Sequence, residues 1–349
     1  MISFYPGPSK VWEQMPVFLQ NAYDSGILQV NHRSVFFEKM YKETVSLIKQ
    51  KLNLPTDYEV FFTSSATECW QILVQSVFES NGVHLHNGAF GEKWFQIAKQ
   101  QLGNDIVEIK FDLSTPEYSI FESCKNKKYI AISDCETSNS TLFPRNILQK
   151  IRTQNADSLI AIDATSSMGG ENIDWQLADI WFASVQKCFG LPAGLAVMVL
   201  NKKAIEVAQN NSSTLYNSLK NIINNGQKNQ TTHTPNVLGI YLMNQLMHQW
   251  VSPFERIKEV SKLYWNIKNV NPKLQLLVED ENMRSHTVIA FKTENDSIKK
   301  IIESALTQNM IIGKGYGKWK DSTFRIANFP AHRIEEHLKM IEFLKLYQV

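Results

Sequence analysis

The amino-acid sequence predicts an α/β protein: a large domain built on a mostly parallel, seven-stranded sheet flanked by helices, and a smaller α+β C-terminal domain. Short β-like runs alternate with helical patterns between residues 58 and 200, and several of these runs are apolar on both faces. After about residue 252 the texture changes to a mixture of long helical patterns and isolated β-like runs. Alternation is typical of parallel strands joined by right-handed crossovers, and doubly apolar strands are typical of a sheet covered on both sides.

Each element can be placed approximately from its pattern. The β-like runs of the central sheet lie at 58–63, 83–86, 105–111, 129–133, 158–162, 179–185 and 194–200. Helices are expected at about 66–79 and 91–102, and a loop containing a short helix at 210–234. Beyond residue 252, helices are expected at about 253–269, 295–308 and 333–346, and strands at 274–278, 287–292 and 323–327.

Composition excludes several kinds of partner. The chain has 349 residues, 43% of them hydrophobic and 20% charged, and its net charge of +2 gives no overall field for nucleic acid or an anionic membrane. The most continuous apolar run, Leu191–Leu200, covers ten positions, whereas a spanning helix needs about twenty. The start, MISFYPGPSK, lacks the features of a secretory signal. The four cysteines have no metal-binding spacing and are too sparse for a disulfide framework, so we expect a cytoplasmic protein without a metal site.

The stretch 160–194 places a carboxylate and a lysine at the ends of two predicted strands. Asp163 ends one apolar run, and Lys187 follows another, 24 positions later. Open α/β sheets bind ligands at the carboxyl ends of their strands. A partly desolvated lysine there has a lowered pKa, which favours the neutral amine that forms a Schiff base, while Asp163 is suited to hold a positive ring nitrogen. Pyridoxal phosphate requires these two groups; a solvated loop lysine and a strand-end cap are the alternative.

Two further segments agree with a cofactor of this kind. Residues 63–67 (TSSAT) follow a predicted strand and open a helix, where backbone N–H groups and the helix dipole attract an anion, although an ordinary helix cap has the same pattern. Phe90 lies between glycines just after a strand, where it can stack on a planar ring or serve as a core residue.

These segments belong to an ordered set that resembles the class V, fold type I, pyridoxal-phosphate-dependent aminotransferases, and among them most closely the phosphoserine aminotransferases. The set spans nearly the whole chain. It comprises Pro-Gly-Pro (6–8), VNHRS (30–34), SSATE (64–68), GAFGEKW (88–94), CETSNS (135–140), IDATSSMGG (162–170), SVQKCFGLPAG (184–194), TTHTPN (231–236) and FRIANFPAH (324–332). The resemblance implies a large cofactor-binding domain over 14–252 and a small domain made of 1–13 and 253–349.

The resemblance also assigns cofactor roles by position. Lys187 would carry the cofactor and later move the α-proton, Asp163 would pair with the pyridine nitrogen, and Thr137 would bind near the phenolic oxygen. Phe90 stands at the ring-stacking position, where phosphoserine aminotransferases usually have Trp. The phosphate ligands implied are Ala66, Thr67 and Gln186 from the same chain, and His233 and Thr234 from a neighbouring subunit, which implies a homodimer with shared active sites.

For the substrate, the resemblance implies that His32 and Arg33 meet the side-chain anion and that Arg325 binds the α-carboxylate. Glu68 departs from the family, because an arginine usually stands there; Lys318 and Trp319 replace a family His-Arg pair. Through the His32-Arg33 pair, the resemblance implies phosphoserine as amino donor with 2-oxoglutarate as acceptor, in serine biosynthesis, whereas Glu68 argues against a substrate phosphate. The alternatives are a class V enzyme that acts on alanine or serine with glyoxylate, a cysteine desulfurase, disfavoured because the last cysteine is Cys188, and a non-catalytic binding protein that keeps the fold.

Overall fold

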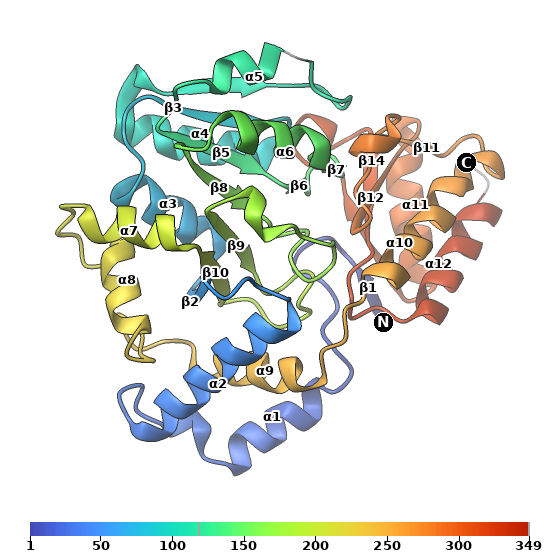
Figure 1. The fold of residues 1–349 in the computed structure, drawn as a ribbon. Coiled ribbons are helices and arrows are strands. Elements are labelled where there is room, and N and C mark those ends of the chain that lie inside the picture. Colours follow the sequence, from blue (N-terminus) through green and yellow to red (C-terminus); the bar gives the residue numbers. More distant parts are fainter. Residues whose placement is uncertain (118, 348–349) are drawn as a thin grey trace.

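The computed structural model describes residues 1–117 and 119–347, and within them the chain forms two large sheets (Figure 1). One has seven strands, mostly parallel, and the other has five. The predicted α/β class is confirmed. Figure 1 shows the larger sheet with its helices on the left and the smaller sheet beside α10, α11 and α12 on the right.

The seven-stranded sheet contains a strand for every run predicted between 58 and 200. Only β10 runs antiparallel to its neighbours, β2 and β9. In spatial order the strands are β2 (Glu59–Thr63), β10 (Ala196–Leu200), β9 (Ile180–Ser184), β8 (Leu159–Asp163), β5 (Tyr129–Ser133), β3 (Gly82–His86) and β4 (Val107–Lys110).

Alternate residues of the inner strands face two different cores. In β8, Ile160 and Ile162 belong to the core on one side of the sheet, and Leu159 and Ala161 belong to the core on the other. All five residues of β8 are buried. This two-sided burial explains why the run is apolar at nearly every position instead of alternating.

Helices cover both faces of this sheet. One core is closed by α1 (Met15–Asp24), α2 (Val35–Lys51), α5 (Ser119–Cys124), α6 (Arg145–Gln154) and α9 (Val237–Gln249). The other is closed by α3 (Ala66–Ser76), α4 (Ala89–Leu102), α7 (Lys202–Asn210) and α8 (Leu219–Gly226). The helix expected inside 210–234 is α8.

The smaller sheet joins the two ends of the chain. Its order is β1 (Ile2–Phe4), β13 (Met310–Lys314), β14 (Thr323–Ala327), β12 (Val288–Lys292) and β11 (Gln275–Leu276). The helices α10 (Phe254–Trp265), α11 (Asn295–Thr307) and α12 (Ile334–Leu346) accompany it. Because β1 pairs in parallel with β13, the first residues lie against the C-terminal part of the chain. The domain limits at 13/14 and 252/253 stay a prediction.

Four strands of the described residues were not predicted. The chain adds β1 and β13 to the smaller sheet, and a short hairpin of β6 (Cys135–Glu136) and β7 (Thr141–Leu142) to the large domain. None of the helices in the described part of the chain combines the length and the apolar character that crossing a bilayer needs.

Candidate active site

Lys187 is buried just after β9, and its amine is held by two hydroxyl groups. Its side chain is 7% exposed. The Nζ atom donates to Thr137 Oγ1 at 2.7 Å and to Ser166 Oγ at 3.0 Å. Burial lowers the pKa of the Lys187 amine, and the carboxylate of Asp163 opposes this shift. The lowered pKa favours the neutral amine, which is the nucleophilic form.

Asp163 lies at the carboxyl end of β8, which is the parallel neighbour of β9. Its Oδ2 accepts a hydrogen bond from the Trp70 indole Nε1 at 2.8 Å, and its Oδ1 accepts one from the backbone N–H of Thr165 at 2.9 Å. Burial raises the pKa of Asp163, while hydrogen bonds from Thr165 and Trp70 and the charge of Lys187 oppose the rise. The donors thus support an ionised carboxylate in a buried place.

A cavity of about 190 Å³ brings Lys187 and Asp163 together with other predicted residues. The predicted site residues that line it are Ala66, Thr67, Phe90, Thr137, Asp163, Gln186, Lys187 and Arg325. The Lys187 Nζ lies 5.3 Å from the centroid of the Phe90 ring. Phe90 also stacks on Tyr316, with ring centroids 5.1 Å apart.

Two helix starts border this cavity. Ser65 caps α3 by accepting a hydrogen bond from Glu68 N at 3.1 Å, so that Ala66 and Thr67 form the first turn. Phe90 lies in the first turn of α4, where Glu136 accepts hydrogen bonds from the backbone N–H groups of Phe90 and Gly91. The sequence rule that small residues open a helix beside a ligand therefore applies at the first of these starts.

Arg325 reaches the cavity from β14 of the smaller sheet. It is 3% exposed, and its Nη1 and Nε donate to the carbonyl oxygens of Thr137 and Lys314, each at 2.8 Å. Burial lowers the pKa of Arg325 to about 10, so the guanidinium stays charged at neutral pH. A buried cation at a cavity wall suits a carboxylate ligand.

The structure does not bring His32, Arg33, His233 and Thr234 to this cavity. Arg33, His233 and Thr234 are exposed, and Arg33 Nη1 donates to Gln230 Oε1 at 2.7 Å. Burial and the neighbouring charges of Arg33 and His233 lower the pKa of His32, so these residues form one cluster.

Glu68, at the position where the resembled family has an arginine, does not line the Lys187 cavity. With His233 it lines a separate, smaller cavity. Its carboxylate accepts hydrogen bonds from Ser64 N and Oγ, both at 2.6 Å, and from Asn217 Nδ2 at 2.7 Å. Burial raises the pKa of Glu68, but these hydrogen bonds outweigh it and the net shift is downward. The negative charge is therefore retained and satisfied within the chain.

Several residues of the site carried no prediction. Trp70 and Tyr316 line the cavity, and the backbone of 6–8 packs against the Lys187 side chain. A Cβ at Gly7 would lie 2.9 Å from Lys187 Cε, so a glycine is needed for this close approach. The Pro-Gly-Pro motif was the available signal for this contact, whereas no local pattern indicates the Trp70–Asp163 bond.

The donor set fits pyridoxal phosphate. Lys187 offers an amine for the cofactor's carbonyl carbon, Asp163 a carboxylate for a protonated ring nitrogen, Phe90 an aromatic face, and Thr137 a hydroxyl. The first turn of α3 and Gln186 offer polar groups for a phosphate. A binding site with these residue types performs chemistry at the α-carbon of an amino acid.

Comparisons with known proteins agree with this reading of the site. The aminotransferase class-V family matches residues 6–315. The phosphoserine aminotransferase of Rhodococcus opacus (strain B4) is 28% identical over 350 residues, which cover 93% of this chain and 89% of the relative. A crystal structure of a phosphoserine aminotransferase from Cytophaga hutchinsonii is similar with a TM-score of 0.90 and 32% identity, over 99% of this chain and 98% of that one. An aspartate aminotransferase from Thermus thermophilus, 18% identical over 99% and 98% of the two chains, shares the fold with a TM-score of 0.85.

Proposed function

Because the chain belongs to the class-V aminotransferases, which are pyridoxal-phosphate-dependent, we propose that it transfers the amino group of phosphoserine to 2-oxoglutarate, in serine biosynthesis in the cytoplasm. The resemblance drawn from the motifs is confirmed at the level of this family. The enzyme is an aminotransferase whose substrates are an amino acid and a 2-oxo acid. When bound, the cofactor supplies the electron sink that lets the amino acid lose its α-proton.

The observation that carries the chemistry is the buried Lys187 amine, which shares one cavity with Asp163 and Arg325. We assign to Lys187 the attachment of the cofactor and the movement of the α-proton at its Nζ atom. The lowered pKa of this amine suits a base that takes up and returns a proton near neutral pH. Asp163, which accepts hydrogen bonds from Trp70 and Thr165, would hold the cofactor's ring nitrogen in its protonated form.

Arg325 is proposed to bind the α-carboxylate of the substrate. Its Nε and Nη1 are fixed by backbone carbonyl oxygens, so the guanidinium plane has a defined orientation before substrate arrives. A fixed fork orients a carboxylate through paired hydrogen bonds. Arg325 donates to the carbonyl oxygen of Thr137, and the Thr137 hydroxyl accepts from Lys187 Nζ. A carboxylate bound to Arg325 would therefore have a defined position relative to the Lys187 amine.

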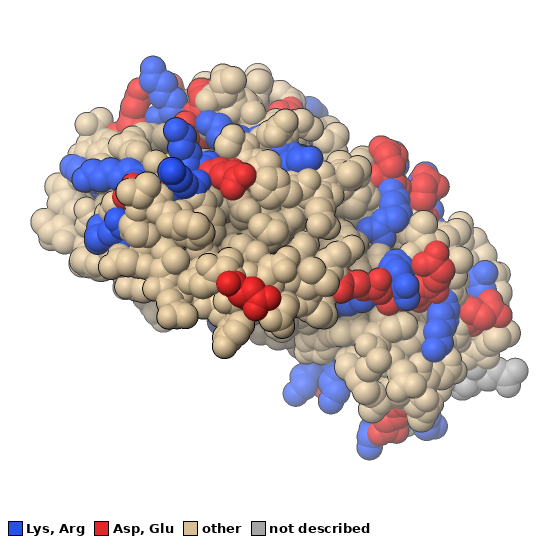
Figure 2. Space-filling model, turned by 90° about the horizontal axis from the view of Figure 1, so that it is seen from below, with Lys and Arg blue, Asp and Glu red and all other residues tan. Residues whose placement is uncertain are grey.

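We further propose a homodimer in which His32, Arg33, His233 and Thr234 complete the partner's active site. In one chain these residues are outside the Lys187 cavity, and three of them are exposed. The neighbouring surface of α1 and the start of α2 exposes large apolar side chains: Val17, Tyr23, Val35 and Phe36 are 60%, 72%, 67% and 55% exposed. Seen from below, a broad area of the molecule carries few charged side chains (Figure 2). Such a surface is suited to a twofold contact between copies.

Phosphoserine is favoured by the names of the relatives and by Arg33, whose charge would select an anionic side chain. Glu68 favours a second candidate, a small neutral amino acid with glyoxylate, because an ionised carboxylate near a substrate phosphate would repel it. Ser64 and Asn217 donate hydrogen bonds to this carboxylate, which does not line the Lys187 cavity, and both observations reduce the conflict.

A donor panel with 2-oxoglutarate as acceptor tests the proposal. Phosphoserine should give the highest kcat/KM. Arg33→Ala should lower kcat/KM for phosphoserine by an amount that corresponds to about 2–4 kcal/mol of lost transition-state stabilisation, as for a charge-assisted pair. The matched control is Arg333→Ala, which also removes an exposed arginine: the Arg333 side chain is 58% exposed and pairs with Glu13. Preference for alanine or serine with glyoxylate, unchanged in Arg33→Ala, would establish the second candidate instead.

Borohydride reduction tests the cofactor lysine separately from the substrate. The reduced protein should carry one phosphopyridoxyl group on the peptide that contains Lys187, and Lys187→Ala should bind no covalently reducible cofactor. A label on another lysine would refute the assignment whatever the amino donor is.

A further inference from the structure

Ser166 lies behind the Lys187 amine and is fully buried. It does not line the cavity and carried no sequence prediction. Its Oγ lies 3.0 Å from Lys187 Nζ and 2.6 Å from Thr137 Oγ1, and Nζ lies 2.7 Å from the same Thr137 oxygen. One amine and two hydroxyls therefore form a closed triangle of hydrogen bonds. Each hydroxyl has one hydrogen to donate and two lone pairs, so the pair can serve either an ammonium or a neutral amine.

The backbone carbonyl oxygen of Ser166 accepts hydrogen bonds from two further side chains. Thr287, next to β12 and fully buried, donates from Oγ1 to the carbonyl oxygen of Ser166 at 2.5 Å. The Cys188 thiol donates to the same oxygen at 3.4 Å. The carbonyl of Ser166 is thus held by Thr287 while its hydroxyl holds Lys187.

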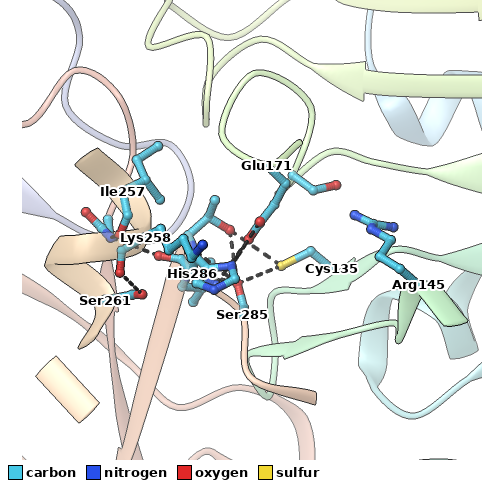
Figure 3. A network of polar contacts seen from close by, with 12 residues as sticks. Cys135, Arg145, Glu171, Ile257, Lys258, Ser261, Ser285 and His286 are labelled. Atoms are coloured by element: carbon cyan, nitrogen blue, oxygen red, sulfur yellow. Dashed lines mark hydrogen bonds and ion pairs between the residues drawn. The ribbon is translucent and has the colours of Figure 1, made fainter. Parts of the chain in front are cut away.

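The residues before Thr287, Ser285 and His286, belong to a larger network of polar contacts (Figure 3). His286 contacts Glu171, with Nδ1 3.0 Å from Oε2, and the backbone N–H of His286 donates to Oε1 of the same carboxylate at 3.1 Å. Figure 3 shows the His286 ring directed at Glu171 and Ser285 directed at Cys135. The backbone N–H of Asn328 donates to the Thr287 carbonyl oxygen at 2.8 Å. These contacts leave Thr287 little freedom to move relative to Ser166.

We propose that Ser166 holds the free amine of Lys187 in place through its hydroxyl. Thr287 is then a positioning residue, because its hydroxyl donates to the carbonyl oxygen of Ser166 and fixes the position of that residue. The proposal rests on the proposed role of Lys187 and is independent of the amino donor. When Lys187 moves the α-proton, Nζ is an ammonium after taking the proton and an amine after returning it. Both hydroxyls accept from the ammonium, whereas one of them donates to the single lone pair of the neutral amine and the other still accepts from it, so Nζ keeps one position in both states.

Other groups that titrate or carry charge also surround Nζ and act on it in every variant. These groups are Asp163 of β8, Cys135 and Glu136 of β6, Cys188 beside Lys187, Arg325 of β14, and Tyr5 and Tyr316 of the cavity wall. Ser166→Ala leaves these groups and their contacts in place, so a change in its titration is attributable to the Ser166 hydroxyl. Thr287→Val also removes the contact of Thr287 Oγ1 with Cys135 Sγ at 3.6 Å, which Thr287→Ser keeps.

The test follows the capture of pyridoxal phosphate by cofactor-free protein, in stopped-flow absorbance across a pH series. Capture needs the neutral amine, so its midpoint pH reports the pKa of Lys187. Hydrogen bonds to a charged donor are the stronger ones, and losing the Ser166 acceptor should disfavour the ammonium. We expect Ser166→Ala to lower the midpoint by about one pH unit. Thr287→Val should lower it by a smaller amount.

Two controls and one rescue variant make the test specific. Ser261→Ala and Thr44→Val each remove a fully buried hydroxyl that donates to a carbonyl in its own helix, and neither should move the midpoint. Thr287→Ser keeps the hydroxyl and should restore the wild-type midpoint. Unfolding temperatures identify any variant that is merely destabilised.

Equal midpoints for Ser166→Ala and Ser261→Ala, both folded, would overturn the proposal that Ser166 holds the Lys187 amine. If Ser166→Ala does not fold, equal midpoints for Thr287→Val and Thr287→Ser overturn the proposal. A borohydride label on a lysine other than Lys187 refutes the proposed cofactor lysine instead, so the two failures are distinguishable.

Discussion

The bond between Trp70 and Asp163 gives a sharp prediction about cofactor affinity. Trp70 Nε1 donates to Asp163 Oδ2 at 2.8 Å, and Asp163 is the carboxylate proposed to hold the cofactor's ring nitrogen. Trp70→Phe keeps an aromatic ring in the buried position and removes only this donor and part of the ring volume. The carboxylate keeps the bond from Thr165 N. We expect the cofactor to bind more weakly because its partner carboxylate is less stable as an ion.

The size of the effect follows from the kind of bond lost. A hydrogen bond to a charged group contributes about 1.5–3 kcal/mol, which corresponds to a Kd for pyridoxal phosphate that is about 10- to 100-fold higher. The pH dependence has a defined sign. Burial already raises the pKa of Asp163 and the Trp70 N–H counteracts it, so the pKa rises further in Trp70→Phe. Since the cofactor needs the ionised form, the acid limb of its binding curve should move toward neutral pH.

The assay is an absorbance titration of cofactor-free protein with pyridoxal phosphate, with Trp94→Phe as the matched control. Trp94 is 1% exposed and stacks on Trp70, with ring centroids 6.2 Å apart. Within residues 1–117 and 119–347, no hydrogen-bond partner is found for its Nε1. Both variants lose core packing and should have lower unfolding temperatures, but only Trp70→Phe should weaken the cofactor. Equal Kd values for the two variants would refute the role of the indole N–H.

Two further predictions concern the surface and the thiols. A Val17→Glu, Tyr23→Glu double variant should sediment as a monomer of about half the wild-type mass and lose turnover. The control Val270→Glu, at another exposed apolar position, should change neither the mass nor the turnover. A wild-type protein that is active as a monomer would contradict shared active sites. Burial raises the pKa of Cys124 and Cys135 to about 12 and raises those of Cys69 and Cys188, so a thiol reagent at pH 8 should modify the cysteines only after unfolding. A rapidly modified cysteine in the folded protein would show that the burial is incomplete.

The central sheet was predictable because its signal is local. Residues of β8 alternate between two cores, so a five-residue run is apolar whichever face is considered. The pairing of β1 with β13 joins Ile2 to Met310, and no local pattern encodes a contact across nearly the whole chain. Gly313 lies in β13. A Cβ there would come within 2.4 Å of Pro6 Cδ, so the glycine permits a close strand contact.

The site was predictable where strand ends decide it. Asp163 and Lys187 follow neighbouring parallel strands, which the apolar runs already indicated, and the rule for ligand binding at carboxyl ends brings them together. The hydrogen bonds of Trp70, Ser166 and Thr287 depend on side-chain orientation inside the folded core. A tryptophan in an apolar helix and a serine after a strand have many possible partners, so residue type alone does not identify these contacts.

Substrate selection is less predictable for a different reason: the effect of a charged residue on the substrate depends on the groups that hydrogen-bond to it in the fold. At the sequence level, Glu68 is a carboxylate where the family has an arginine, which argues against a phosphate. In the fold its oxygens accept from Ser64 and Asn217, and the carboxylate also attracts His233 of the same chain. Its charge is therefore satisfied by donors of the same chain, and it lies near His233, one of the residues proposed to reach the partner's cofactor phosphate. These contacts weaken the argument that Glu68 raises against a substrate phosphate, and the Arg33→Ala donor panel measures the preference for an anionic side chain directly.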